Sequence, residues 1–294
     1  MNVRFGYGSP ADVRAAADVV RLAEQADRDG LDLFSLSDHP YLPNLLDAYA
    51  TLAFLLGRTT RISALANVTN LPLRPAPMLA RTASALTAIS NGRFVLGLGA
   101  GGAPDRIATM GVTTKRPAEA VESFEQAMIL VRRLSGGGPA VTDPYSGATA
   151  LAPSPIEAAQ IWTGSVGPKS LAATGRQADG WIPGHAADWL SEPYRTSRAI
   201  IDEAALAVGR KPADVATVYN FPGRITQQPL AKVRDDEGRW LGGSPAQWIE
   251  ELTSAVLDHD AAGFILFPTG PDPIDVTLSR WSQEIVPAVR AAIG

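Results

Sequence analysis

The residues best suited to acid–base chemistry are an Asp–His pair, Asp38 and His39, which follows the apolar run at 33–37. Histidine changes its protonation state near neutral pH and can give a proton to a substrate or take one from it. His185 follows another apolar stretch and is a second candidate. A purely structural alternative is that Asp38 braces a loop and His39 is only its neighbour. With three histidines and no cysteine in the chain, we expect no metal site.

Two glycine-rich loops could bind a phosphate through their backbone N–H groups. The sequence GLGAGG at 97–102 ends one apolar run, and GSVGP at 164–168 follows another. Glycine allows a close backbone approach and a positive φ, and the start of a helix directs N–H groups towards an anion. If the two runs are neighbouring strands, both loops present donors on the same face.

The first loop also matches the dinucleotide fingerprint G-x-G-x-x-G at Gly97, Gly99 and Gly102. That fingerprint requires a helix that opens in the loop and an acidic strand end about twenty residues later. Here a non-periodic stretch runs to Pro117 instead, which argues against a Rossmann fold. A further alternative is that the glycines simply let backbone segments pack closely.

Strand-like and helical segments alternate along the chain. Apolar runs typical of strands occur at 3–7, 33–37, 61–67, 94–98, 161–163, 181–182, 215–221 and 264–267. A helical pattern follows each run, most clearly over 118–134, and the last predicted helix covers 275–293. This order predicts an α/β fold, a single (β/α)8 TIM barrel over residues 1–294, with its chemistry at the carboxyl ends of the strands. We interpret 136–160, a candidate hairpin, and 222–243 as insertions after the fourth and seventh βα units.

The composition is that of a globular protein with a large core. The chain is 46% hydrophobic and 19% charged, with a net charge of −4. This charge pattern favours neither nucleic acid nor a membrane surface as a partner. We also expect a cytoplasmic location, because the N-terminus lacks a secretion signal and no apolar run approaches transmembrane length.

Four segments in this order resemble the luciferase-like superfamily of flavin- and deazaflavin-dependent oxidoreductases. They read LSDH at 36–39, NVTNLPLRPAPMLAR at 67–81, NGRFVLGLGAGG at 91–102 and GSVGPKSLAATGRQADGW at 164–181. The resemblance implies a TIM barrel, often a homodimer, that binds FMN or coenzyme F420 across the barrel mouth. The Asp–His pair is more like the F420-using branch.

The resemblance also implies roles for individual residues. The cofactor ring would lie against a bulge after the third strand, which matches Asn67, Val68 and Asn70, and we predict a cis peptide between Asn67 and Val68. Asp38 matches a position that approaches the ring, and it would also orient His39, the proton partner. The phosphate and tail of the cofactor would contact the two glycine-rich loops at Gly101, Gly102, Gly164, Ser165 and Gly167.

One position departs from the family pattern. The sugar-phosphate dehydrogenases of the F420 branch carry an acidic Glu where this chain has Gly102, which cannot transfer a proton. We therefore predict hydride transfer between F420 and a small organic substrate other than a sugar phosphate. The alternatives are an FMN-dependent monooxygenase that uses reduced flavin and O2, with a reductase as transient partner, and a cofactor-binding barrel without catalysis.

Overall fold

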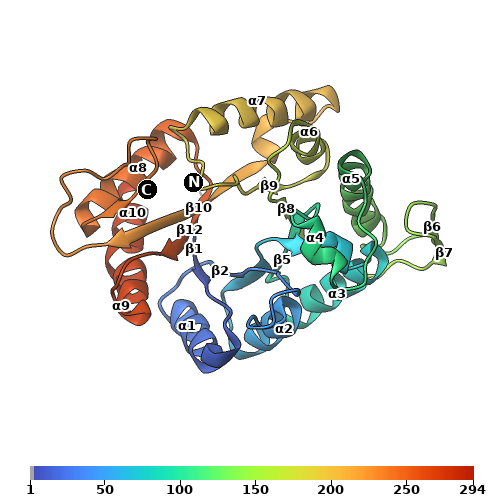
Figure 1. The fold of residues 1–294 in the computed structure, drawn as a ribbon, viewed down its shortest axis with the longest axis horizontal. Helices are drawn as coiled ribbons and strands as arrows, with labels where there is room; N and C mark the ends of the chain where they lie inside the picture. Colours follow the sequence, from blue (N-terminus) through green and yellow to red (C-terminus); the bar gives the residue numbers. More distant parts are fainter. Residues whose placement is uncertain (1–2) are drawn as a thin grey trace.

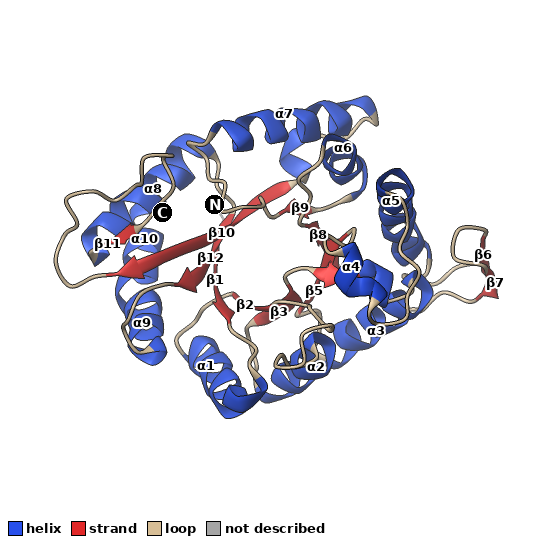
Figure 2. Cartoon of the chain, in the orientation of Figure 1, coloured by secondary structure: helices blue, strands red, loops and turns tan. Residues whose placement is uncertain are grey.

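The computed structural model describes residues 3–294, which form a closed ring of parallel strands enclosed by helices (Figures 1 and 2). The ring strands are β1 (Arg4–Ser9), β2 (Leu33–Leu36), β3 (Ser63–Ala66), β5 (Phe94–Gly99), β8 (Gln160–Thr163), β9 (Gly180–Trp181), β10 (Ala216–Ile225) and β12 (Gly263–Pro268). β12 pairs with both β1 and β10, and β9 pairs with β10, which closes the barrel. The predicted TIM barrel is confirmed. Two short strands, β4 (Thr69–Asn70) and β11 (Gly242–Gly243), extend the sheet beside β5 and β10.

The helices surround the ring in the order that the sequence pattern predicts. They are α1 (Ala16–Arg28), α2 (Ala48–Arg58), α3 (Ala76–Ile89), α4 (Pro104–Ala108), α5 (Pro117–Arg133), α6 (Pro168–Gln177), α7 (Glu192–Ala207), α8 (Pro245–His259), α9 (Ile274–Ser279) and α10 (Val286–Ile293). The short helix α4 lies in the stretch that shows no periodicity in the sequence. No helix within residues 3–294 combines the length and the apolar character that crossing a membrane requires.

The last predicted helix, 275–293, is interrupted. A π-helical segment, Arg280–Ile285, joins α9 to α10. Pro287 lies in the first turn of α10 and has no N–H to donate to the preceding turn, and a wider turn accommodates the missing hydrogen bond. The apolar face nevertheless stays continuous, with Trp281, Ile285 and Val289 all buried.

The first insertion is an antiparallel hairpin of β6 (Val141–Asp143) and β7 (Ala148–Leu151) between α5 and β8, and it stands away from the barrel (Figure 2). The second insertion differs from the prediction in extent and position. Residues Pro222–Ile225 continue strand β10, because they pair with β12 and β11, so the insertion is shorter. It lies between β10 and α8, inside the seventh βα unit rather than after it.

Two layers of side chains hold the barrel together. Inside the ring, the apolar cluster consists of Leu33, Leu65, Val95, Trp162, Ile182, Val218 and Ile265, with Val68 and Phe267 packed against it. Outside the ring, a larger cluster joins the strands to the helices and includes Phe5, Phe264 and Trp281. With its interior filled, the barrel has no central pore, and active sites of this fold lie at the carboxyl ends of the strands.

Asp27, near the end of α1, ties that helix to the turn before β3. Its buried carboxylate accepts hydrogen bonds from the N–H groups of Thr60 (3.0 Å), Arg61 (2.8 Å) and Ile62 (2.7 Å). Burial by itself would raise the pKa of Asp27, but these hydrogen bonds outweigh it and lower the pKa below its usual value. Folding therefore favours the charged carboxylate, which stabilises the protein above the ordinary pKa and loses that effect as the pH falls through the lowered pKa.

We expect Asp27→Asn to lower the free energy of unfolding by about 1–3 kcal/mol at pH 7, as is typical of lost hydrogen bonds to a charged group. Urea unfolding at pH 7 and at pH 3 measures the effect, and the difference from the parent should shrink at the lower pH. Asp18→Asn, which changes an exposed carboxylate on the same helix, is the control. A difference that does not depend on pH would contradict this account of Asp27.

Candidate active site

His39 lies at the carboxyl end of β2 with its imidazole exposed. The Nδ1 atom is 2.8 Å from the hydroxyl of Tyr41, and the two rings are tilted against each other. The guanidinium of Arg106, on α4, lies over the Tyr41 ring at 5.9 Å. His39 is thus held through one ring nitrogen, and within the described residues Nε2 has no hydrogen-bond partner. Nε2 is therefore the atom through which His39 could exchange a proton with a substrate.

Asp38 is not the partner of His39, contrary to the sequence-based prediction. Its carboxylate is buried and forms a two-pronged ion pair with Arg74, with distances of 3.0 Å from Nε and 2.8 Å from Nη2. The N–H of Asn70 donates to the same carboxylate at 3.0 Å. The carboxyl group therefore braces the segment after β3, which is the structural alternative that the sequence left open.

Arg74 completes this brace from the turn that precedes α3. The same Nη2 also donates to Asp47, the N-cap of α2, at 2.8 Å, and the guanidinium lies 4.2 Å from the centre of the Tyr49 ring. Burial alone would lower the pKa of Arg74, but Asp38 and Asp47 outweigh it and raise the pKa above its usual value. Arg74 therefore stays charged, and it joins the strand ends of β2 and β3 to α2.

The bulge after β3 carries the predicted cis peptide between Asn67 and Val68. The Val68 side chain projects over β5 and the loop after β8. A Cβ at Gly99 would lie 2.8 Å from Val68 Cγ2, and one at Gly164 would lie 3.0 Å from it. These two glycines therefore make room for Val68. Gly99 and Gly164 therefore serve close packing, as the second hypothesis from the sequence has it, and not phosphate binding.

The other glycines of the two loops differ in how much space surrounds them. Gly101 has a φ of +96°, which favours glycine, and packs against Pro72. Gly102 has open space on its Cβ side, and Gly167 is the N-cap of α6 with only Ser170 close by. Backbone at these last two positions is open to a ligand. Space at Gly102 also shows that crowding does not exclude an acidic side chain there.

Ser165 turns away from the loop surface. Its hydroxyl is buried and accepts a hydrogen bond from Thr174 on α6 at 2.9 Å, and its carbonyl accepts one from the Trp181 indole at 2.9 Å. These bonds fix the loop on the helix layer. The side chain of Ser165 is therefore a structural group, and only the backbone N–H groups of this loop remain as candidate contacts.

Asn67 forms a reciprocal amide pair with Asn220 of β10 across the top of the barrel. Asn67 Nδ2 donates to Asn220 Oδ1 at 2.8 Å, and Asn220 Nδ2 donates back at 3.3 Å. A side-chain pair between residues 153 positions apart fixes the bulge against the opposite wall. The pair forms a polar floor to the barrel mouth, by which we mean the surface around His39, the bulge and the two loops.

His185 lies on a different part of the rim. It is exposed, has a φ of +58°, and lines a cavity of about 310 Å³ that also contacts Ser165, Gly184 and Arg239. No hydrogen bond joins it to His39 within the described residues. The two candidate histidines therefore do not form one acid–base pair.

The sequence analysis missed three residues of the mouth: Tyr41, Arg74 and Asn220. Arg74 lies in the segment that carries the family resemblance, but a single arginine gives no sign of its partner. Asn220 interrupts the apolar strand VYNFP, and an inward polar residue at a strand end is a signal that could have found it. Tyr41 offers no comparable signal.

The family model for the luciferase-like monooxygenases matches residues 3–234. The chain belongs to this family. The matched residues include the strands that carry His39, the bulge and both glycine-rich loops, and they end before α8.

Two relatives of this chain are oxidoreductases, and one of them is named as F420-dependent. A phthiodiolone/phenolphthiodiolone dimycocerosates ketoreductase of Mycobacterium kansasii is 30% identical over 61% of this chain, and the chain spans only about half (48%) of that relative's length. An F420-dependent glucose-6-phosphate dehydrogenase of Kineococcus radiotolerans is 27% identical, with 98% of this chain and 97% of the relative covered.

Solved structures show that the fold is shared with users of both cofactors. The coenzyme F420-dependent tetrahydromethanopterin reductase of Methanopyrus kandleri superposes with a TM-score of 0.78 at 16% identity, covering 98% of this chain and 99% of that one. Other structures with this fold are monooxygenases, one of them in complex with FMN. At such low identity the likeness concerns the fold alone.

The mouth fits a cofactor of the luciferase-like family in one specific respect. Asn70 Oδ1, on the bulge, is buried and has no hydrogen-bond partner within residues 3–294. An unpaired buried acceptor is costly, and a ligand N–H would satisfy it. F420 and FMN share a pyrimidine edge that bears such an N–H group, so Asn70 fits either cofactor.

Proposed function

We propose that this chain is an oxidoreductase that transfers a hydride between coenzyme F420 and a small organic substrate. The observation that carries the proposal is the placement of His39 beside the braced bulge. One nitrogen of its exposed imidazole is held by Tyr41, and the other has no hydrogen-bond partner among residues 3–294. The near full-length similarity to an F420-dependent dehydrogenase supports F420 as the cofactor.

Each part of the mouth has a role in this proposal. Asn67, Val68 and Asn70 would hold the ring, and the backbone at Gly102 and Gly167 would contact the phosphate and tail. Asp38 would act through Asn70 and Arg74, which keep the bulge in place. Bound F420 would supply or accept the hydride, and the protein would orient it and exclude water. His39 would move the accompanying proton to or from the substrate through Nε2.

The proposed substrate class rests on the absence of an acidic side chain at position 102. Gly102 carries no acid, so His39 is the group we assign to proton transfer, and a carbonyl or alcohol that needs a single proton suits it. The dehydrogenase relative is named for glucose 6-phosphate, but this chain lacks the Glu that the resemblance associates with that reaction. We therefore propose a small carbonyl compound or alcohol rather than a sugar phosphate.

An anaerobic assay tests the reaction directly. Reduced F420 is mixed with a panel of ketones, aldehydes and enones, and oxidised F420 with the corresponding alcohols, while the F420 absorbance is followed. We expect a substrate-dependent change with at least one compound class. Bound F420 that stays unchanged across the panel would instead support a cofactor-binding barrel without catalysis.

An FMN-dependent monooxygenase remains the second candidate, because the matching family model is that of luciferase-like monooxygenases and one structure with this fold holds FMN. This function predicts oxygen consumption with reduced FMN and a substrate. It also needs a reductase as a transient partner. For either function we propose that the chain works as a homodimer.

Tyr41 should act as a positioning residue for His39. We expect Tyr41→Phe to lower kcat about 5- to 10-fold with little change in KM, because one hydrogen bond of roughly 1 kcal/mol no longer fixes the imidazole. The ¹⁵N NMR spectrum of the His39 ring should also change from one tautomer to a mixture. Tyr145→Phe, on the β6–β7 hairpin, which contributes no residue to the barrel mouth, is the matched control. An unchanged spectrum in Tyr41→Phe would show that Tyr41 does not hold His39.

A further inference from the structure

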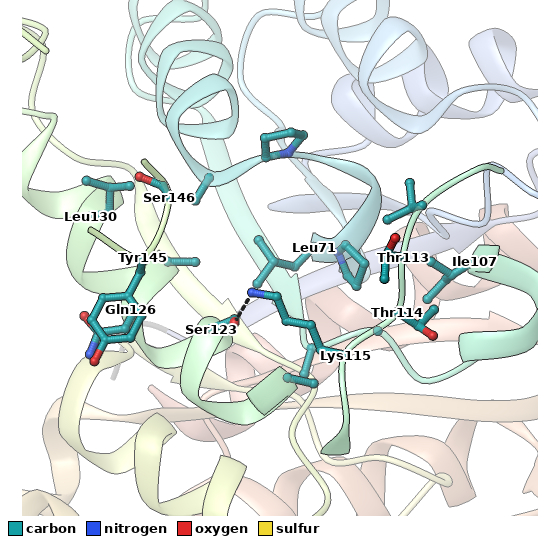
Figure 3. Close-up of a pocket in the computed structure, with 18 of the residues that line it drawn as sticks. Leu71, Ile107, Thr113, Thr114, Lys115, Ser123, Gln126, Leu130, Tyr145 and Ser146 are labelled. Atoms are coloured by element: carbon teal, nitrogen blue, oxygen red, sulfur yellow. Dashed lines mark hydrogen bonds between the residues drawn. The ribbon is translucent and has the colours of Figure 1, made fainter. Parts of the chain in front are cut away.

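Beside the barrel mouth lies a cavity of about 280 Å³, which we call the side cavity (Figure 3). Its walls come from four segments: the loop at 71–77, the stretch at 100–115, helix α5, and the tip of the β6–β7 hairpin. Its volume is close to the lower end of the range of about 300–1,000 Å³ found for ligand pockets. Neither His39 and its partner Tyr41 nor any residue of the bulge lines this cavity.

Most of the lining is apolar and stiff. Four prolines contribute, at positions 72, 75, 77 and 104, together with Leu71, Ile107, Val112 and Leu130. Proline fixes its φ, so these loop segments have few alternative conformations. A preformed apolar cavity favours an apolar ligand, because a ligand that enters it removes apolar surface from water without reorganising the walls.

The polar groups of the side cavity divide into two sets. Lys115 lies on one side, where its ammonium donates to Ser123 Oγ, close to Thr113 and Thr114 (Figure 3). At the hairpin lies Asp143, whose buried carboxylate accepts the N–H of Ser146 at 2.8 Å. An anionic group would be repelled at the hairpin and attracted at Lys115.

The charge of Lys115 is not neutralised by a direct ion pair within the described residues. Glu119 interacts with it at longer range, but that carboxylate is paired with Arg116. A cation at the edge of an apolar cavity is the arrangement that recognises an amphipathic anion. We propose that the side cavity binds a medium-chain carboxylate, with the apolar chain along the proline-rich wall and the carboxylate at Lys115.

The side cavity adjoins the first glycine-rich loop at Gly101, which is one of its lining residues. Pro72 and Ile107 pack against Gly101, where a Cβ would lie 2.6 Å from Pro72 Cγ. Neither His39 nor Asn67, Val68 or Asn70 is among the residues that line the cavity. This makes the cavity a second site, distinct from the one proposed for F420 and substrate.

Isothermal titration calorimetry of the purified chain, without cofactor, tests this proposal. The probes are octanoate, octanol and octylamine, which share a chain and differ in charge, and acetate, which has the charge without the chain. We expect octanoate to bind at one site per chain, octanol and octylamine to bind at least fivefold more weakly, and acetate to give no signal.

Two variants locate the octanoate on the protein. Lys115→Met should weaken octanoate binding about fivefold or more, as expected for a lost hydrogen-bonded charge pair. Lys211→Met, which changes a lysine that precedes β10 at the other end of the barrel, should bind like the parent. Ala120→Phe fills the cavity from the first turn of α5 and should abolish binding, with circular dichroism to confirm that the variant is folded.

Absence of octanoate binding to the parent chain, or equal binding of octanoate and octanol with no effect of Lys115→Met, would overturn the proposal. Loss of a dimer in Ala120→Phe, together with no octanoate binding to the parent chain, would also overturn it. The cavity would then belong to a subunit interface. Because the titration needs neither cofactor nor turnover, its outcome is independent of whether the chain uses F420.

Discussion

Replacing His39 by alanine should lower turnover by about 10²- to 10⁴-fold, the range typical of a lost general acid or base. The imidazole is exposed at the end of β2, so its removal should leave the fold and the buried brace around Asp38 intact. Cofactor affinity should therefore change little. Steady-state kinetics with the substrate found in the anaerobic assay, together with a cofactor titration, measures both effects.

The other two histidines provide the comparison for this variant. His259→Ala, at the end of α8, should behave like the parent in both measurements. His185→Ala should retain more activity than His39→Ala, because His185 lies on another loop of the rim. Unchanged turnover in His39→Ala, or a larger loss in His185→Ala, would remove His39 from the reaction.

The second large effect concerns the brace behind the bulge. Asp38→Ala should lower the free energy of unfolding by about 3–5 kcal/mol, because it leaves the guanidinium of Arg74 without its buried partner. The N–H of Asn70 loses its acceptor in the same variant. Urea unfolding measures the stability. Cofactor affinity should fall as well, since the bulge is no longer held.

Asp47→Ala is the matched control for Asp38→Ala. It removes the other carboxylate that contacts Arg74, but Asp47 is half-exposed and also caps α2 through the N–H of Ala50. We expect a cost of about 0.5–2 kcal/mol, as for other lost helix caps. A cost below 1 kcal/mol for Asp38→Ala, or a larger cost for Asp47→Ala, would contradict the role assigned to the buried pair.

The barrel and its rim could be predicted from the sequence because both depend on local patterns. Alternating apolar runs and helical periods located all eight ring strands, and the strand ends then placed Asp38, His39 and the glycine-rich loops on one face. The bulge was located by its resemblance to the family. These features need only the order of residues along the chain.

The contacts that define the mouth could not be predicted, because they join distant residues. Asp38 and Arg74 are 36 positions apart, and Asn67 and Asn220 are 153 apart, so nothing in either local sequence names the partner. His39 and Tyr41 are only two residues apart, but their contact depends on side-chain rotamers. Gly99 and Gly164 resemble phosphate-binding glycines, and only the position of Val68 shows that they serve packing.

The central claim is that the barrel mouth binds F420 in preference to FMN. Equilibrium titrations of the purified chain with each oxidised cofactor, under the same conditions, test it most directly. We predict that F420 binds at least about tenfold more tightly than FMN, a difference of about 1.4 kcal/mol. Tighter binding of FMN would contradict the claim and favour the monooxygenase.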